Sequence, residues 1–382
     1  MVTIQKEAVM SKYYDDYEIT DAHVHPGSVI DFQDFEKAAC FFMDNVHIKG
    51  ANLLCINGVH PDLAGSELMA LALKTRDFRF SVYGGFGYWM NTIPHDGPGL
   101  KRQLEALMAA GFDGLKMFEG KPTERAAGGI ALDDPRYDPS FDLLEKTGYH
   151  ILSHVNDPEE FWNEDTCPKW ANDGTGGYWD TNKFLSKEQY YTENENILAR
   201  HPNLNITFAH AYFLSNFPDR MAALLDRYPN VTIDLCPGSE MYDGFTKQYK
   251  LWREIFVNYA DRFIFGTDNV INPLSEDSLA QYGKGSIKIE NIVRFLSTPD
   301  EFEGWVYKLK GLNLPSQVVK KILSDNYLRV RGKAKPVIAD AVVTYAETLN
   351  AEVDNRNDIG NANKKSIAGS LQYFKTLAGK TR

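Results

Sequence analysis

The chain has 382 residues, of which 43% are hydrophobic and 24% are charged, and its formal net charge is −11. This composition fits a soluble globular enzyme with a large core. An acidic chain with no basic run outside its mixed C-terminal tail is not expected to bind nucleic acid. The first twelve residues lack the apolar core of a signal peptide and no segment has the length of a membrane span, which predicts a cytoplasmic protein without a membrane partner. Four scattered cysteines predict free thiols.

Eight short apolar runs, rich in β-branched and aromatic residues and bounded by Gly, Pro or Asn, predict β-strands. In chain order they are Tyr17–His25, Ala51–Asn57, Phe78–Phe86, Gly114–Phe118, Tyr149–Val155, Asn205–Ala211, Val231–Leu235 and Arg262–Thr267. Helical patterns such as Leu100–Ala110 and Asp219–Tyr228 separate them. Alternating strands and helices predict a parallel sheet, and eight strands are the number that closes a (β/α)8 TIM barrel. An open doubly wound sheet is the alternative, but it usually carries a Gly-rich turn after its first strand, and here His-Val-His-Pro-Gly stands in that place.

Two regions depart from this repeat. The long connection 158–195 is dense in aromatic residues and leaves the fifth strand on the side expected to carry the active site. Its tryptophans, among them Trp170 and Trp179, either cap the barrel mouth and stack on a planar or cyclic substrate or form a small core of their own. Both hypotheses stay open, and the first makes Trp170 and Trp179 substrate-binding residues.

The second region is the C-terminal part of the chain. We predict a barrel domain over residues 1–331 and a helical extension over 332–382. The extension holds two helical patterns, Val337–Leu349 and Ser366–Leu377, joined by the polar run Asp354–Lys365, which we interpret as a flexible hinge. It is expected to pack on the barrel or on a neighbouring copy, so a homo-oligomer is a further hypothesis.

His23 and His25 end the first predicted strand, two residues apart. Successive side chains of a strand alternate faces, so both imidazoles project to the same side, where they can be adjacent ligands of one metal ion. This spacing alone is weak support, because such pairs also decorate the faces of sheets. Barrel enzymes place their chemistry at the C-terminal ends of the strands. The other strand ends of this chain carry Lys116, His154, His210 and Asp268.

Four imidazoles, a lysine and an aspartate that converge on one barrel mouth would bury several polar groups without partners, which is costly. A divalent cation removes this cost, because it takes His nitrogens and a carboxylate as ligands. We therefore predict a metal site. The alternative for any single residue of the set is a histidine at the edge of the core that is satisfied by backbone hydrogen bonds.

The chain also resembles the amidohydrolase superfamily, and it is most similar to the amidohydrolase-related branch, often labelled amidohydrolase 2. The resemblance runs from about Glu18 to Asn326. Its motifs occur in family order: Asp21-Ala22-His23-Val24-His25-Pro26, Gly114-Leu115-Lys116, His154, Phe208-Ala209-His210 and Phe265-Gly266-Thr267-Asp268. This resemblance implies a metal-dependent TIM-barrel enzyme. It does not imply one substrate, because the branch includes lactonases, hydrolases, hydratases and decarboxylases of aromatic acids.

The resemblance assigns a role to each strand-end residue. It makes His23, His25, His154 and Asp268 the metal ligands, with Asp268 and His210 as the catalytic residues. One Zn²⁺ per chain is expected, with Mn²⁺ as another choice of metal. Lys116 is expected to bind an anionic substrate, and the alternatives are a carbamylated Lys116 that bridges two metal ions or a lysine at the rim of the barrel.

These roles predict hydrolysis of a lactone, ester or amide of a small, cyclic or anionic molecule by an activated water. The alternative is non-oxidative decarboxylation of an aromatic or unsaturated acid. That reaction needs a cation for the substrate's carboxylate, and the candidates are Lys116, Lys121, Arg125 and Arg136. A barrel that binds a ligand without turnover would be expected to lack one of the metal ligands, and all four positions are filled.

Overall fold

The structure is a computed structural model, and it describes residues 13–27, 31–169, 178–272, 274, 276–305, 307–354 and 356–380, with the side chains of 239 and 276–286 left aside. Within these residues no helix combines the length and the apolarity that crossing a bilayer requires.

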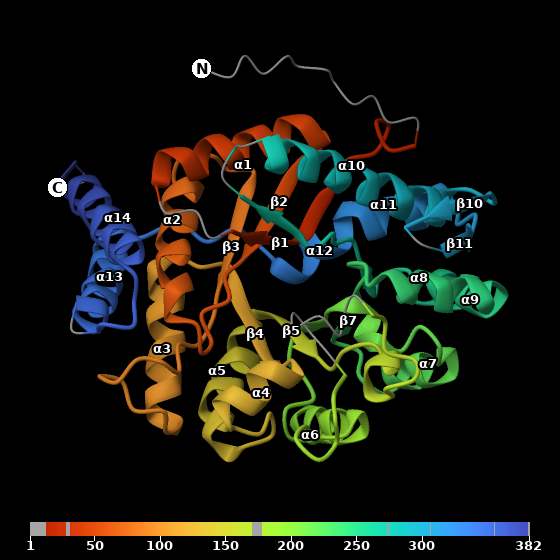
Figure 1. Cartoon of the computed structure of the whole chain (residues 1–382), viewed down its shortest axis with the longest axis horizontal. Coiled ribbons are helices and arrows are strands. Elements are labelled where there is room, and N and C mark those ends of the chain that lie inside the picture. Colours follow the sequence, from red (N-terminus) through yellow and green to blue (C-terminus); the bar gives the residue numbers. More distant parts are fainter. Residues whose placement is uncertain are drawn as a thin grey trace.

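The molecule is built around one sheet of parallel strands (Figure 1). In chain order the strands are β1 Thr20–Pro26, β2 Gly50–Leu54, β3 Phe80–Gly84, β4 Gly114–Gly120, β5 His150–Val155, β6 Ile206–Phe208, β7 Val231–Asp234, β8 Phe263–Ile264 and β9 Asn269–Ile271. Consecutive strands from β1 to β8 are neighbours, and β9 lies on the other side of β1. All eight predicted strands are therefore confirmed, each within a few residues of its predicted ends.

The eighth strand of the barrel is broken into β8 and β9. The backbone amide of Ala22 in β1 donates to the carbonyl oxygen of Phe265 at 3.0 Å, and the amide of Asp268 donates to the carbonyl oxygen of His23 at 2.8 Å. Because β1 also pairs with β9, these bonds join the first strand to the eighth on both sides of the break and close the ring. The predicted (β/α)8 TIM barrel is confirmed.

Helices follow the strands as the repeat requires. The longer ones around the barrel are α1 Phe32–Val46, α2 Ala64–Lys74, α3 Gly97–Ala110, α5 Asp138–Thr147, α6 Lys187–Arg200, α7 Pro218–Arg227, α9 Tyr249–Asn258 and α10 Glu276–Ser297. Shorter helices are α4 Pro122–Gly128, α8 Ser239–Lys247, α11 Ser316–Lys320 and α12 Asn326–Arg331, the last two joined by a π-helical turn at Lys321–Asp325. The hairpin β10 Glu301–Gly304 and β11 Tyr307–Lys310 was not predicted.

The sequence places strands and helices alternately, and α7 shows why each helix covers the sheet. Pro218 lies in its first turn, where a missing amide costs nothing, and Met221, Leu224 and Leu225 form its buried face. The helix ends before Pro229, as predicted.

The C-terminal extension forms two helices, α13 Ala339–Asp354 and α14 Asn361–Lys380, which pack against each other. In Figure 1 they lie at the left, where α13 contacts α3 and α14 contacts α2 of the barrel. Both helices are longer than their sequence patterns predicted. The polar run Asp354–Lys365, which was predicted to be a flexible hinge, therefore lies partly inside them. The connection between them is short, and Arg356 in it donates to the carbonyl oxygen of Trp89 at 2.6 Å.

Candidate metal centre

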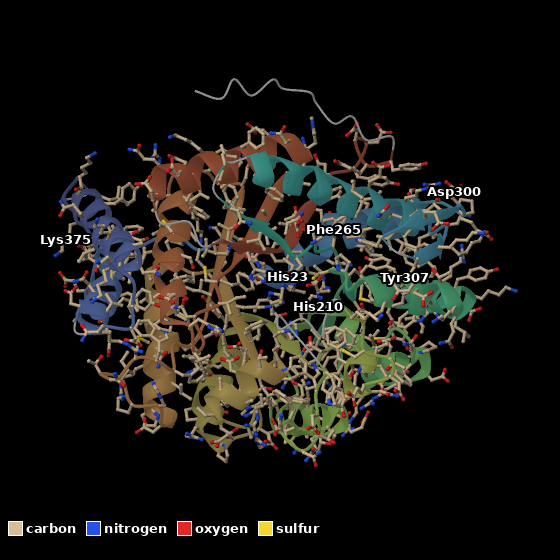
Figure 2. All side chains as sticks on the ribbon, in the orientation of Figure 1. His23, His210, Phe265, Asp300, Tyr307 and Lys375 are labelled. Carbon is tan, nitrogen blue, oxygen red and sulfur yellow. The ribbon has the colours of Figure 1, made fainter. Side chains whose placement is uncertain are left out.

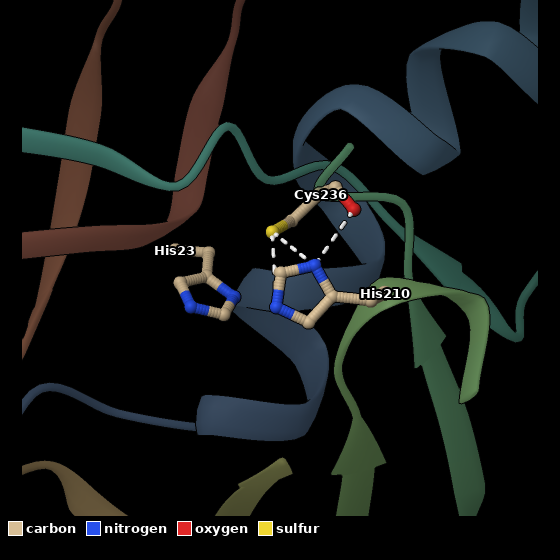
Figure 3. Close-up of side chains that lie close together, drawn as sticks. All are labelled: His23, His210 and Cys236. Carbon is tan, nitrogen blue, oxygen red and sulfur yellow. Dashed lines mark hydrogen bonds between the residues drawn. The ribbon is translucent and has the colours of Figure 1, made fainter. Parts of the chain in front are cut away.

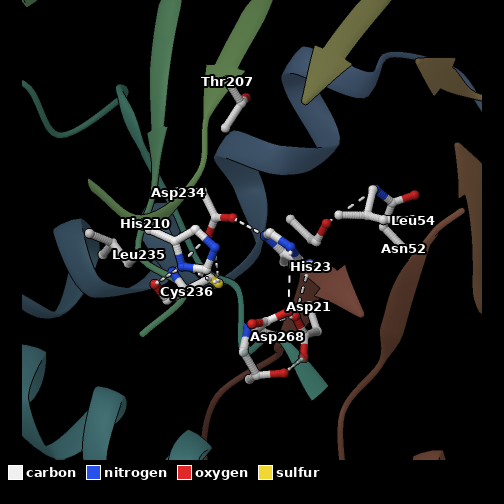
Figure 4. A network of polar contacts seen from close by, with 12 residues as sticks. Asp21, His23, Asn52, Leu54, Thr207, His210, Asp234, Leu235, Cys236 and Asp268 are labelled. Atoms are coloured by element: carbon white, nitrogen blue, oxygen red, sulfur yellow. Dashed lines mark hydrogen bonds and ion pairs between the residues drawn. The ribbon is translucent and has the colours of Figure 1, made fainter. Parts of the chain in front are cut away.

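His23 of β1 lies near the centre of the molecule, beside Asp234 and Asp268 (Figures 2 and 4). The ring of His25, on the same strand, lies 5.0 Å from the ring of His23 between centroids. Their Nε2 atoms are 3.1 Å apart. The Nδ1 atom of His25 lies 2.8 Å from the carbonyl oxygen of Leu54, which can only accept a hydrogen bond. Nδ1 of His25 is therefore the donor in this bond, and Nε2 is the ring nitrogen that is left to bind a metal ion.

Asp234 at the end of β7 holds the other ring. Its Oδ2 atom lies 2.5 Å from Nδ1 of His23, and its Oδ1 atom accepts the backbone amide of Cys236 at 2.7 Å. Burial lowers the pKa of His23 well below its usual value, so this ring is neutral. A proton on Nδ1, donated to Asp234, leaves a second lone pair at the Nε2 atom of His23.

Asp268 completes the group from the break in the eighth strand. Its Oδ1 atom is 3.2 Å from Nε2 of His25 and 3.7 Å from Nε2 of His23. The residue has φ +55°, a conformation that costs energy in a non-glycine residue and is typical of functional sites. The buried carboxylate of Asp21 fixes this turn, because it accepts the amide of Thr267 at 3.1 Å and its hydroxyl at 2.5 Å.

These donors fit a divalent cation. Two nitrogens at ~2.0–2.1 Å from one ion stand about 2.9–3.4 Å apart for angles between octahedral and tetrahedral. The 3.1 Å between the two Nε2 atoms falls in this interval. Two lone pairs and a carboxylate at these distances attract a cation and repel one another without it. The side chain of Asp268 is 38% exposed, so the group also has an open side.

His154, the fourth predicted ligand, lies at the end of β5 but in a different environment. Its Nε2 atom donates to the carbonyl oxygen of Asn156 at 2.9 Å, and the centroid of its ring lies 4.9 Å from that of the His210 ring. Among the described residues it is in neither of the two groups of potential ligand atoms that converge within 4.8 Å. Its role as a ligand therefore remains a prediction.

The second of these groups joins His23 to His210 and Cys236 (Figure 3). The Nδ1 atom of His210 lies 3.3 Å from the carbonyl oxygen of Cys236 and 3.2 Å from its Sγ atom. Burial lowers the pKa of His210 to about 3, so the ring is neutral at pH 7. If Nδ1 carries the proton, it donates to the carbonyl; if the thiol donates to Nδ1, the Nε2 atom of His210 becomes the donor.

Lys116 on β4 is buried, at 2% exposure, and no hydrogen-bond partner of its Nζ atom is among the described residues. It lines a small pocket, of about 20 Å³, at the C-terminal ends of β2, β3 and β4, whose walls include four aromatic side chains, Phe86, Tyr88, Phe118 and Tyr137. The other candidate cations are paired: Lys121 with Asp157 at 3.1 Å, Arg125 with Glu193 at 3.1 Å and Arg136 with Asp134 at 2.8 Å. Lys116 is thus the candidate best placed to meet an anion.

The structure tests the prediction for only one of the two tryptophans named in the long connection 158–195. Trp170 lies outside the described residues. Trp179 is 3% exposed and packs with Phe161 and Phe184, and its Nε1 atom donates to Asp157 at 3.1 Å. These contacts favour the small-core hypothesis over stacking on a substrate.

Replacing Trp179 by alanine is therefore expected to lower stability by about 3 kcal/mol, as for other buried aromatic residues. Metal content and KM should stay at the wild-type values. Denaturant unfolding, elemental analysis and kinetics test this expectation, with Tyr178→Ala as the neighbouring control. A changed substrate preference in Trp179→Ala at unchanged stability would instead support the lid hypothesis.

Asp234 and Cys236 are site residues that the sequence did not predict. Both lie at the end of the apolar stretch of β7, where their neighbours are core residues. The one local signal is their spacing: residues 234 and 236 alternate in the same way as 23 and 25, which places two polar side chains on one face of a strand end.

Comparisons with known proteins identify the family of the chain. The sequence profile of a family described as "Amidohydrolase" matches residues 76–330. The match leaves out His23 and His25, which β1 nevertheless brings into the same barrel. A search among curated protein sequences found no match.

Several solved structures match the chain. A TIM-barrel protein from Bordetella bronchiseptica is 14% identical, with a TM-score of 0.52 over 83% of this chain and 100% of its own. IDCase from Metarhizium anisopliae is 15% identical, with a TM-score of 0.47 over 83% of this chain and 97% of its own. The 5-carboxyvanillate decarboxylase of Novosphingobium aromaticivorans, solved with manganese, is 13% identical, with a TM-score of 0.48 over 86% and 99%. The family match covers more than half of the chain, which therefore belongs to the amidohydrolase family and is an enzyme of the amidohydrolase superfamily.

Proposed function

We propose that the chain is a metal-dependent hydrolase that directs a water molecule at the carbonyl carbon of a small, cyclic or anionic lactone, ester or amide. The observation that carries this proposal is the pair of imidazole Nε2 atoms 3.1 Å apart, each with its Nδ1 atom occupied, beside the carboxylate of Asp268. A cation in this place suits the metal-dependent family to which the chain belongs.

His23, His25 and Asp268 would hold the ion, with His154 as the predicted fourth ligand. A bound Zn²⁺ would supply an activated water, because it lowers the pKa of that water from ~15.7 to about 7. Asp268, on the open side of the group, would take the proton of the attacking water and pass it to the leaving group. The Nε2 atom of His210 would donate to the substrate's carbonyl oxygen when its Nδ1 atom accepts from the Cys236 thiol.

Lys116 would bind an anionic group of the substrate, and this role predicts a pH dependence. Burial lowers the pKa of Lys116 to about 8, although nearby carboxylates such as Asp268 oppose the shift. The ammonium is therefore present below pH 8 and is lost above it. We expect the inhibition constant of benzoate to rise up to about tenfold per pH unit above pH 8.

Lys116→Met keeps a side chain of similar length without the charge. It should bind benzoate weakly at every pH, which makes it the matched control. An inhibition constant that is the same at pH 7 and pH 9.5 in the wild-type protein would contradict the role of Lys116.

Decarboxylation of an aromatic acid is the second candidate. One observation favours it: Lys116, whose Nζ atom has no hydrogen-bond partner among the described residues, lines a pocket with aromatic walls, and such walls suit a flat carboxylate. Hydrolysis and decarboxylation share the metal centre and differ in their products.

Elemental analysis of protein purified without chelator, followed by an activity panel of lactones, acyl amides and hydroxybenzoates, tests the proposal. We expect about one transition metal per chain, Zn²⁺ or Mn²⁺, and release of a titratable acid proton from a lactone or amide. Two ions per chain would favour a carbamylated Lys116. Release of CO₂ from a hydroxybenzoate would establish the decarboxylase, and a metal-free protein after supplementation would overturn both.

A further inference from the structure

A second cavity lies away from the metal centre, between the barrel and the C-terminal extension. It has a volume of about 230 Å³ and lies between α3 and α13, which run side by side in Figure 1. Every residue that lines it is uncharged, and its apolar wall includes Met90, Ile93 and Leu107. A cavity of ~150 Å³ lined by apolar residues holds benzene, so this one has room for a ring with a short substituent.

One polar group that lines this cavity, which we call the groove, has no hydrogen-bond partner among the described residues. Gln103 on α3 is 3% exposed, and its Oε1 atom accepts the backbone amide of Gly87 at 2.9 Å. That bond fixes the orientation of the side-chain amide, because the Gly87 N–H can only donate. The Nε2 atom of Gln103 then has no acceptor among the described residues. A buried, unsatisfied N–H group costs free energy, which an acceptor in the groove would recover.

The hydroxyl groups that line the groove already donate elsewhere. Tyr345 donates to Glu67 at 2.5 Å, Thr344 to the carbonyl oxygen of Asp340 at 3.2 Å and Thr348 to the carbonyl oxygen of Thr344 at 3.2 Å. Gln103 is therefore the lining side chain with an unused donor. A lone water at that amide would meet mainly apolar wall, whereas buried waters usually make two to four hydrogen bonds.

We propose that the groove between α3 and α13 binds a small neutral molecule with an apolar ring and one hydrogen-bond acceptor, and that Gln103 recognises the acceptor. The uncharged lining selects against ions, since a buried charge without a partner is costly. The ring packs on Met90, Ile93 and Leu107, and a ketone, ester or ether oxygen accepts from Nε2. This site is distinct from the metal centre, because none of its lining residues belongs to that centre, and Gly85 is the one lining residue that it shares with the pocket of Lys116.

Calorimetric titration with acetophenone and ethylbenzene tests the site. The two probes have almost the same shape, but ethylbenzene lacks the oxygen. We expect acetophenone to bind once per chain and about two- to tenfold more tightly than ethylbenzene, the range for one neutral hydrogen bond. Gln103→Glu keeps the acceptor for Gly87 and replaces the donor by an oxygen, so it should abolish this preference.

Two further variants make the result independent of the folding of Gln103→Glu. Ala341→Phe places a ring in the groove from α13 and should abolish binding of both probes, while Ala351→Phe on the same helix, at an exposed position outside the groove, should not. The proposal is overturned if acetophenone does not bind, if both probes bind the wild-type protein equally, or if binding survives in Ala341→Phe. The last outcome would place the probe at the metal centre or elsewhere.

Discussion

Replacing His210 by alanine is expected to reduce turnover ~10²–10³-fold while the protein keeps its metal. This is the loss typical when one donor to a developing oxyanion is removed. The ring of His210 belongs to the second group of potential ligand atoms, and its centroid lies 5.4 Å from that of the His23 ring. It begins a run of four residues with left-handed backbone conformation, His210 to Phe213, at the end of β6. Turnover and metal content of the same preparation are the two measurements. His47→Asn changes an exposed histidine in the left-handed position that ends α1 and should leave both unchanged.

Cys236 provides a finer test of the same role. Cys236→Ser keeps a hydroxyl that can donate to Nδ1 of His210, whereas Cys236→Ala leaves only the carbonyl oxygen and favours a proton on Nδ1. We expect turnover by Cys236→Ala to be slower than by Cys236→Ser, because in Cys236→Ala the Nε2 atom of His210 no longer carries a proton to donate. Loss of metal from His210→Ala would instead make His210 a ligand and contradict the assignment.

The sequence predicted the parts of this molecule that depend on local pattern. Strand alternation put His23 and His25 on one face, and eight strands separated by helices implied a closed ring. The break between β8 and β9 was not visible, because the predicted eighth strand ends at Thr267 and the turn at Asp268 depends on the buried carboxylate of Asp21. A contact between residues so far apart in the chain leaves no periodic signal.

Contacts between residues far apart in the chain also explain why Asp234 and Cys236 were not predicted as site residues. Asp234 acts through a contact with a ring 211 residues earlier in the chain, and Cys236 through one with His210. Gly266 shows how closely these segments approach, since an added Cβ atom would lie 2.4 Å from Oδ1 of Asp234 and 2.8 Å from Cβ of His23. The motif around Gly266 was recognised, but only the packed barrel shows what requires the glycine.

Asp234→Asn is expected to weaken metal binding about 10–100-fold, the usual effect of removing a carboxylate behind a ligating histidine. The form of His23 that can hold a cation carries its proton on Nδ1 and donates it to Oδ2, while Oδ1 accepts the amide of Cys236. An asparagine has only one acceptor oxygen for these two donors. Either the Cys236 amide loses its partner, or the ring of His23 faces an NH₂ group and moves its proton to Nε2, which removes the lone pair that binds the metal.

The measurement is the Kd for Zn²⁺, by competition with a chelating dye, and it does not require a known substrate. Asp113→Asn is the matched control, because Asp113 is also buried and pairs with Lys74 at 2.6 Å. Both variants should lose stability, since each leaves buried donors with a weaker acceptor, but only Asp234→Asn should change the metal Kd. Equal Kd values in the two variants would show that Asp234 supports the barrel without orienting His23. A tenfold or greater difference would show that this carboxylate sets which nitrogen of His23 is free, and hence that β7 belongs to the metal centre.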